Sequence, residues 1–468
     1  MYKAYIDRVQ RKKKNRLYRR PVLLLTLVFA ALPMTLGAEA SGSGRPDLSP
    51  EIRAELEGYR DRTVGWLLEQ KAPNAIVPEP LPWRRNLVIS YRIPENDPAA
   101  PYLEGRAYIY DSALAAIAFT MTDRYREAED VLFALSRQLR DDGSLWFGVN
   151  LHNDWPSEEG HGGATVRSGA SAWAGYAATY YLRKRLAEDP GFDMTDRING
   201  RILFFAEKTA GHLLALQITD SGDPRYGMVT GGMGTYTLEA DESGEVVSIY
   251  GDTQIGWVST EHNIDAYFLF KDLAELTGDE RYRRGFRMVE EGLLTLWDGD
   301  RSQLIQGIKK DGRRDTVLPL DTSSWGSMFF RAAGHTGLAH TALDVTVDRF
   351  RVDSTGRYRP YAGDELYLDD GVSRAYFGDP DITWNDIDIT WPEGALGVAA
   401  ALIKGDRIDH ALEIIRSAAE LSVDGGIRYA SLEVPHQFST YPSAASTGWM
   451  VIAVEGLLDP VDGGLFWE

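Results

Sequence analysis

The connections between the helices predicted for this chain alternate strictly between short and long. Each predicted helix carries apolar residues at spacings of three and four, as in ILFFAEKTAGHLLAL, which is typical of a helix with one buried face. Four of the short connections are the tripeptides TDR, TGD, AGH and KGD, whereas the segments before alternate helices run for roughly twenty to forty residues. The sequence predicts twelve helices, over residues 48–70, 105–121, 124–140, 167–187, 193–217, 260–277, 280–297, 321–334, 336–349, 390–404, 406–421 and 443–457.

This alternation predicts six helical hairpins, because a tight turn makes two successive helices run antiparallel. An open α-solenoid also stacks helix pairs, but its repeats keep a fixed period. Here the helices that follow long connections begin 62, 93, 61, 69 and 53 residues apart. They are also rich in Ala, Gly and Ser, as in RSGASAWAGYAATYY, which allows close packing around one axis. The expected fold is therefore an all-α (α/α)6 barrel with these six helices inside.

The long connections and the N-termini of the inner helices should meet on one rim of such a barrel. Long loops within a compact domain usually serve a functional site. One of them, TYTLEADESGEVVSIYGD, alternates around Ser-Gly and predicts a small β-hairpin on this rim. The Gly-rich stretch GMVTGGMGTY does not lead from a strand into a helix, so it indicates no nucleotide site. We expect a groove across the barrel mouth.

Residues 1–40 differ from the rest of the chain and are typical of an export signal. A basic stretch, RVQRKKKNRLYRR, precedes the apolar PVLLLTLVFAALPMTLG, and the small-x-small pattern AEA at 38–40 fits a cleavage site. The apolar run contains Pro33 and is short for a membrane-spanning helix. We therefore expect a periplasmic or secreted protein with a single catalytic domain over 41–468. An uncleaved anchor in the inner membrane is the alternative.

Without its basic N-terminus the chain is strongly acidic. The formal net charge is −19, and residues 1–38 contain nine Lys or Arg and one Asp, so the remainder carries −27. That charge disfavours nucleic acid and anionic lipid as partners, and favours a neutral or cationic ligand. The absence of Cys excludes disulfides and thiol catalysis. The His- and acid-rich HNDWPSEEGHGG has no recognised metal-ligand spacing, so neither a metal nor a cofactor is expected.

Acids and aromatic residues are concentrated at the entrances of the predicted inner helices. Of the twelve Trp residues, seven lie in the long loops or within a first helical turn. Aromatic faces stack on the apolar C–H faces of sugar rings, and polar side chains bind the hydroxyls, so this composition predicts a carbohydrate site. The candidate substrate-binding residues are Tyr110, Trp146, Trp155, Trp257, His262, Asn263, Asp321, Trp325, Trp384, Trp391, Glu393 and Tyr441.

Hydrolysis of a glycosidic bond requires one protonated and one ionised carboxyl group. Glu261 has a Trp shortly before it and Asp265 one helical turn after it, and both neighbours would raise its pKa. We therefore expect Glu261 to be the general acid. Asp111, at the start of the first inner helix, is the expected base, since a helix N-terminus favours the ionised form. Asp386 and Asp388 compete for the role of base, and the acid and base assignments could be exchanged.

Each of these residues also has a purely structural explanation. Ser259 or Thr260 followed by an acid is a common helix cap, which would account for Glu261. Glu393 follows Pro392 at a helix start, where both residue types are favoured. The catalytic interpretation depends on several acids and aromatic residues converging on one rim, not on a single motif.

The sequence resembles the bacterial six-hairpin glycosidases in three segments, YDSALAAI, STEHNIDAYFLFKDLAELTGDERY and WPEGALGVAAAL. The resemblance covers nearly the whole chain after the N-terminal segment. It implies an (α/α)6 enzyme that acts on polysaccharides, often by inversion with paired carboxylates. Glu104 and Gly105 followed by Tyr108 also resemble the acid-bearing segment of family-eight cellulases, which implies that Glu104 is a rival general acid. Leu103 replaces the Ser that usually precedes that Glu.

The leading hypothesis is an exported glycoside hydrolase that cleaves a polysaccharide or oligosaccharide. A polysaccharide lyase is the closest alternative, because His262 and Asn263 could neutralise a uronic acid while Tyr110 acts as base. A non-catalytic carbohydrate-binding protein of an exopolysaccharide system is a third interpretation. The acidic composition argues against a polyanionic substrate.

Overall fold

The computed structural model describes residues 48–72, 77, 81–156, 164–189, 191–240, 246–363, 376–379, 381–434 and 437–468. Residues Asp47–Glu468 form one compact unit. The predicted export segment lies outside the described residues. No helix within the described ranges has the length and hydrophobicity needed to cross a bilayer.

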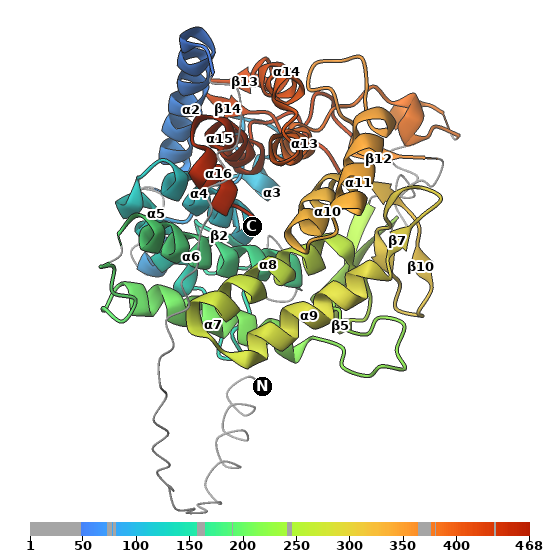
Figure 1. Ribbon diagram of the computed structural model, residues 1–468. Coiled ribbons are helices and arrows are strands. Elements are labelled where there is room, and N and C mark those ends of the chain that lie inside the picture. The colour runs from blue at the N-terminus through green and yellow to red at the C-terminus, as the bar shows by residue number, and fades with distance from the viewer. Residues whose placement is uncertain are drawn as a thin grey trace, which may run out of the picture. The chain divides into compact units, whose positions relative to one another are not determined.

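Twelve of the described helices pack as six pairs, each with an inner and an outer member (Figure 1). The inner helices form a closed ring in the order α4, α6, α8, α10, α13 and α15. This arrangement confirms the predicted (α/α)6 barrel. The pairs are α4 Ile109–Met121 with α5 Tyr125–Ser136, α6 Ser168–Glu188 with α7 Asn199–Ala215, α8 Thr260–Thr277 with α9 Glu280–Leu294, α10 Leu320–Ala332 with α11 Thr336–Arg349, α13 Pro392–Lys404 with α14 Ile408–Ala419, and α15 Ala444–Leu458 with α2 Pro50–Gln70.

The last pair joins helices from the two ends of the described chain. The first outer helix, α2, packs against the last inner helix, α15, and the two lie side by side in Figure 1. Arg60 of α2 and Glu455 of α15 approach to 3.6 Å. The barrel is therefore closed by a contact between segments almost 400 residues apart.

Two predicted helices begin later than their apolar patterns indicate. The helix predicted from residue 105 begins at Ile109, after strand β1, and a second one is delayed further. The structure starts α7 at Asn199 rather than at 193. The Asp193 carboxylate accepts the backbone N–H of Thr195 at 2.7 Å, and the Asp196 carboxylate accepts that of Ile198 at 2.7 Å. Asp side chains that bond the backbone two residues on stabilise turns at the expense of helix.

Short strands position the starts of the inner helices. β1 Arg106–Tyr108, β3 Val166–Arg167, β6 Val258–Ser259 and β11 Leu318–Pro319 lead directly into α4, α6, α8 and α10. The predicted hairpin is formed by β4 Gly232–Ala240 and β5 Val246–Ile255, and β3 pairs with β4. The other strands are β2 Gly148–Asn150, β7 Trp297–Asp298, β8 Gln303–Leu304, β9 Gly307–Ile308, β10 Arg314–Asp315, β12 Tyr361–Ala362, β13 Ser422–Val423 and β14 Gly426–Ile427. The remaining short helices are η1 Pro82–Arg84, α3 Ala100–Leu103, η3 Trp384–Asp386 and α16 Pro460–Leu465.

The junction between β3 and β4 tolerates only glycine at position 232. Gly232 has φ +115°, and a Cβ there would lie 2.2 Å from the carbonyl oxygen of Val166. We expect Gly232→Ala to lower the free energy of unfolding by about 3 kcal/mol, because both backbone strain and a clash result. In contrast, a Cβ at the exposed position 211 of α7 would have no atom within 4 Å. Gly211→Ala should therefore raise the free energy of unfolding by up to about 1 kcal/mol. Urea denaturation of both variants measures these free energies, and an equal change in the two variants would contradict the prediction.

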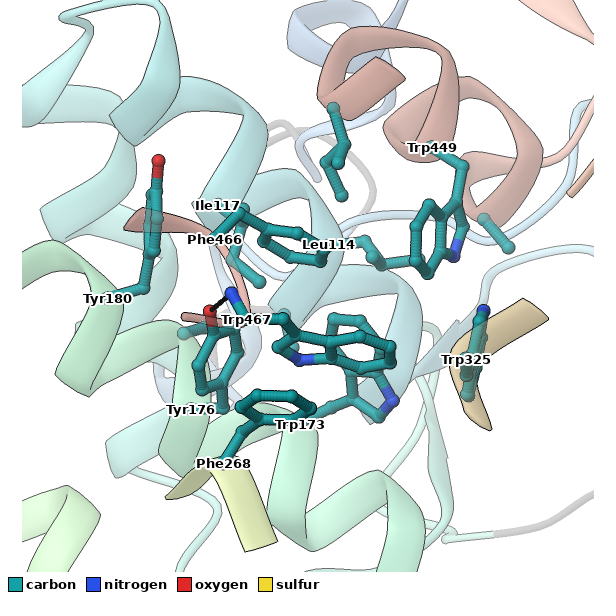
Figure 2. Packing of buried hydrophobic residues seen from close by; sticks show 14 of the residues in the cluster. Leu114, Ile117, Trp173, Tyr176, Tyr180, Phe268, Trp325, Trp449, Phe466 and Trp467 are labelled. Carbon is teal, nitrogen blue, oxygen red and sulfur yellow. Dashed lines mark hydrogen bonds between the residues drawn. The ribbon is translucent and has the colours of Figure 1, made fainter. Parts of the chain in front are cut away.

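Aromatic side chains fill the centre of the barrel (Figure 2). After α16, the C-terminal residues Phe466 and Trp467 enter this cluster and are almost fully buried. Trp467 stacks on Phe268 of α8 with ring centroids 4.9 Å apart and an interplanar angle of 4°. Its backbone N–H donates to the Tyr176 hydroxyl at 2.7 Å. The end of the chain thus forms part of the core that supports the inner helices.

Candidate active site

A cavity of about 440 Å³ lies where the inner helices begin. All six inner helices contribute lining residues, almost all of them from a first or second turn. This geometry is the convergence on one rim that the sequence predicts. The lining residues are Tyr91, Tyr108, Tyr110, Asp111, Phe147, Arg167, Gly169, Ala170, Trp173, Trp257, Glu261, His262, Asp265, Asp321, Trp325, Trp391, Glu393, Tyr429 and Ala445.

Five carboxyl groups line this one cavity. They come from four different inner helices. Four of the carboxyls lie in a first helical turn, where the helix dipole favours a negative charge, and Asp265 lies in the second turn of α8. Four of them are at most 6% exposed, whereas the Glu261 side chain remains 36% exposed. The five residues are Asp111 of α4, Glu261 and Asp265 of α8, Asp321 of α10 and Glu393 of α13.

Glu261 and Asp321 form a hydrogen-bonded carboxyl pair between α8 and α10. Burial, followed by the charge and the hydrogen bond of Asp321, raises the pKa of Glu261 well above its ordinary value. Burial also raises the pKa of Asp321, but the backbone N–H of Thr322, at 2.7 Å, favours the ionised form there. Of the two carboxyls, Glu261 is therefore the one whose surroundings more strongly favour the protonated form.

Asp111 and Glu393 are two further carboxyls with raised pKa values. Burial raises the pKa of Asp111 to about 7, against a hydrogen bond from Ser90. Burial raises the pKa of Glu393 to about 8, although the Tyr110 hydroxyl donates to Glu393 Oε1 at 2.7 Å. The Trp449 indole N–H in turn donates to the Tyr110 hydroxyl at 2.8 Å, which fixes its orientation. Carboxyls that differ in pKa within one site can serve as acid and base.

His262 is a neutral side chain in this cavity. Burial and the nearby Arg167 lower the pKa of His262 to about 3. Its Nδ1 lies 3.0 Å from the Ser168 hydroxyl and its Nε2 lies 3.7 Å from Glu261 Oε1. The Trp257 ring packs beside it with centroids 5.6 Å apart. His262 is thus held between the α6 start and the proposed acid.

Several predicted site residues lie outside the cavity. Asp386 is exposed and accepts the backbone N–H of Thr383 at 2.9 Å in a capping box, and Asp388 is also exposed. Glu104 is exposed at the end of α3. These three carboxyls do not line the cavity, so their positions do not support the predicted catalytic roles. Trp384 is fully buried in a small cluster of apolar side chains, so its ring cannot contact a sugar in this conformation.

The other predicted contacts have structural partners or distant positions. Asn263 is buried and bonds the backbone of Val229 in both directions. Tyr441 donates to Asp97 at 2.6 Å, and the Trp146 ring is covered by the Arg140 guanidinium at 4.1 Å. Trp155 is 42% exposed and, like Asn263, Tyr441 and Trp146, it does not line the cavity.

The structure adds residues that sequence reasoning did not select. Trp173 lies in the second turn of α6, beyond the helix entrances to which the sequence search was restricted. Tyr91 and Tyr429 come from loop segments with no helical pattern, and Arg167 from the strand before α6. The sequence does contain a signal for Trp173. It is a single large aromatic residue among the small residues of an inner helix, which favours a position facing the interior of the barrel.

The buried acids should make the protein less stable at high pH. The folded-state pKa of Glu393 is about 8, above its ordinary value of 4.5, so the fold favours the protonated form. Its contribution is fully present below about pH 4.5 and is lost as the pH rises through about 8. We therefore expect Glu393→Gln to reduce, by a few kcal/mol, the fall in unfolding free energy between pH 5 and pH 9. Urea denaturation at both pH values tests this, with exposed Asp388→Asn as control, and parallel curves for wild type and Glu393→Gln would contradict it.

Comparisons with known proteins give the fold. No protein-family model matches the chain, and no curated protein matches its sequence. A solved wild-type glycosidase superposes with a TM-score of 0.55 and 10% identity, over 90% of this chain and 100% of its own. A D-mannose isomerase superposes with a TM-score of 0.57 and 9% identity, over 89% of this chain and 100% of its own. The cellobiose 2-epimerase of Bacillus thermoamylovorans superposes with a TM-score of 0.56 and 10% identity, over 86% of this chain and 99% of its own. The chain shares the (α/α)6 barrel fold of these solved structures.

Proposed function

We propose that the chain is a glycoside hydrolase that cleaves a glycosidic bond in the cavity at the starts of the inner helices. The observation that supports this most is the set of five carboxyls beside aromatic walls, with pKa values raised to different extents. Glycosidases need one carboxyl that donates a proton and one that accepts a proton at the same pH. This site contains both kinds.

In the proposed mechanism Glu261 is the general acid and Asp111 the base. The Glu261 carboxyl donates its proton to the glycosidic oxygen as the bond to the anomeric carbon breaks. Asp111, with a pKa of about 7, is partly ionised at neutral pH and accepts a proton from a water molecule that attacks the same carbon from the opposite face. Asp321 holds the proton on Glu261 before transfer and stabilises its position. The product has the inverted configuration.

The shape of the site favours a chain end or a short oligosaccharide as substrate. A volume of about 440 Å³ lies at the lower end of the range for enclosed small-molecule sites, about 300–1,000 Å³. The sequence predicts a longer groove lined by Trp146, Trp155 and Trp384, and none of these residues lines the cavity. We therefore propose cleavage near a chain terminus.

The N-terminal segment supports export, so we propose that the hydrolase acts on a periplasmic or extracellular glycan. The basic and apolar stretches within residues 1–40 carry this proposal. Cell fractionation and N-terminal sequencing of the recovered protein would test it, and full-length protein in the cytoplasmic fraction would refute it.

The test of the hydrolase proposal is a screen of purified protein against a panel of polysaccharides and oligosaccharides. Reducing ends are quantified, and NMR of the fresh product determines whether the anomeric configuration is inverted. Binding without cleavage by the wild-type protein would instead indicate a non-catalytic carbohydrate-binding protein. Ultraviolet absorbance of an unsaturated product would indicate a lyase, although Asn263, one of the groups that a lyase requires, is engaged with Val229.

A sugar isomerase or epimerase is a second candidate, favoured by one feature of the site. Such enzymes move a proton on carbon and need an acid and a base that face the same carbon atom. His262 and Glu261, with Nε2 and Oε1 3.7 Å apart in the cavity, are such a pair. Incubation with reducing mono- and disaccharides in deuterated water tests this, because isomerisation or epimerisation by proton transfer introduces solvent deuterium.

A further inference from the structure

Asp265 is the carboxyl that the proposed mechanism leaves unused. It lies on α8 one helical turn after Glu261, is only 3% exposed and lines the cavity. Its Oδ1 has no hydrogen-bond partner among the residues that the structure describes. Buried polar atoms are nearly always hydrogen-bonded, so an unpartnered carboxylate oxygen in a cavity indicates a position for a ligand donor.

The surroundings of Asp265 suit a positive charge on that donor. The Trp173 indole N–H bonds its carboxyl, and the rings of Trp173 and Trp325 lie 5.8 Å apart in the same cavity wall. Indole faces attract cations as well as the C–H faces of sugars. A group that combines a sugar ring with an ammonium would use both properties of these walls.

The composition of the cavity lining points in the same direction. Five carboxyls line the cavity, and among the described residues the one permanently cationic lining side chain is Arg167. The lining therefore contains four more carboxyl groups than permanent cations within the described part of the chain. A bound cation would relieve the mutual repulsion that ionising these acids creates.

We propose that the sugar bound at Asp265 carries a free amino group, so that the substrate is an oligosaccharide containing amino sugars without N-acetyl groups. The ammonium of this sugar donates to Asp265 Oδ1, and the carboxyl is ionised in the complex. Burial raises the pKa of Asp265 well above its ordinary value in the empty site, and a bound ammonium would lower it again. This inference rests on the proposed hydrolase for its substrate, but amino-sugar binding is measurable without turnover.

The experiment measures equilibrium binding of monosaccharides, which avoids any assumption about the linkage. Glucosamine, N-acetylglucosamine and glucose, and the corresponding galactose series, are titrated into the full protein by calorimetry or ligand-observed NMR. We expect one amino sugar to bind at least tenfold more tightly than its hydroxyl and N-acetyl counterparts, since a charge-assisted hydrogen bond replaces a neutral one. Equal affinities, tighter binding of the neutral sugars, or no binding of either would overturn the proposal.

Two variants assign this preference to Asp265. Asp265→Asn keeps the shape and a hydrogen-bonding oxygen but removes the charge, so it should abolish the preference for the amine over the neutral sugars. Asp386→Asn removes an acid outside the cavity and should change nothing. A preference that survives in Asp265→Asn contradicts the assignment. The comparison of sugars on the wild-type protein stands even if Asp265→Asn fails to fold.

The outcome separates this inference from the proposed function. Cleavage of a neutral oligosaccharide without preferential binding of an amino sugar would refute the inference and leave the hydrolase. Asp265-dependent binding of amino sugars without cleavage of any glycan on the panel, amino-sugar oligomers included, would refute the hydrolase and leave the inference.

Discussion

Glu261→Gln should lower kcat on a natural glycan by two to four orders of magnitude. Loss of a general acid typically costs about 10²–10⁴-fold. The Gln side chain preserves the size of Glu261 and can still bond to Asp321, but it has no proton to donate. The measurement is kcat at saturating substrate, accompanied by a thermal unfolding curve to show that the variant is folded. Asp386→Asn, the same replacement of a carboxyl by an amide outside the cavity, should keep wild-type kcat.

The nature of the leaving group distinguishes the proposed acid from the proposed base. An activated aryl glycoside departs without protonation, so the deficit of Glu261→Gln should shrink greatly on such a substrate. The deficit of Asp111→Asn should persist, because the attacking water still needs a base. If both variants were equally impaired on every substrate, the two assignments would have no support. If Glu261→Gln retained full activity on the natural glycan, Glu261 would not be the acid.

Trp467→Ala should lower the free energy of unfolding by about 3–5 kcal/mol, the usual cost of removing a large aromatic side chain from a core. Trp467 is 1% exposed, stacks on Phe268 at 4.9 Å and lies 5.2 Å from the Trp173 ring (Figure 2). Chemical denaturation gives the value. Phe204→Ala on α7 removes an aromatic side chain that is 53% exposed, and should change the stability by less than about 0.5 kcal/mol.

The same substitution should also affect the cavity. Trp173 lines the cavity on one side and contacts Trp467 on the other, so the void left in Trp467→Ala removes support from the cavity wall. We expect weaker sugar binding together with the lower stability. A stable Trp467→Ala variant would show that the C-terminal residues are dispensable for the barrel.

The sequence was sufficient to predict the barrel and the side of it that holds the site. Turn length sets the direction of the next helix, so the alternating connections alone predict that Asp111, Glu261 and Glu393 lie on one rim. The sequence predicts that Glu261 and Asp321 both lie on the rim, but not that their carboxyls are hydrogen-bonded. The distance between the starts of the neighbouring helices α8 and α10 depends on how the two helices pack.

Loop residues were predicted poorly for a physical reason. Asp386 and Trp384 lie two residues apart at the entrance to an inner helix, yet one is exposed and the other fully buried. The capping box with Thr383 orients Asp386, and packing in the small apolar cluster orients Trp384. The first interaction is specific to this turn and the second is tertiary, so neither follows from a regular sequence pattern. A helix start constrains its side chains through a regular backbone, whereas a loop does not.

The pairing of α2 with α15 has a consequence for how the molecule is made. A ribosome releases α2 first, but its main packing partner begins at Ala444, so the apolar side of α2 stays unsatisfied until translation is nearly finished. Closing so long a loop is slow, and nascent chains with uncovered apolar surface tend to aggregate. We expect chaperone dependence during synthesis, and a circular permutant that places α2 directly after α15 should refold faster than the natural order.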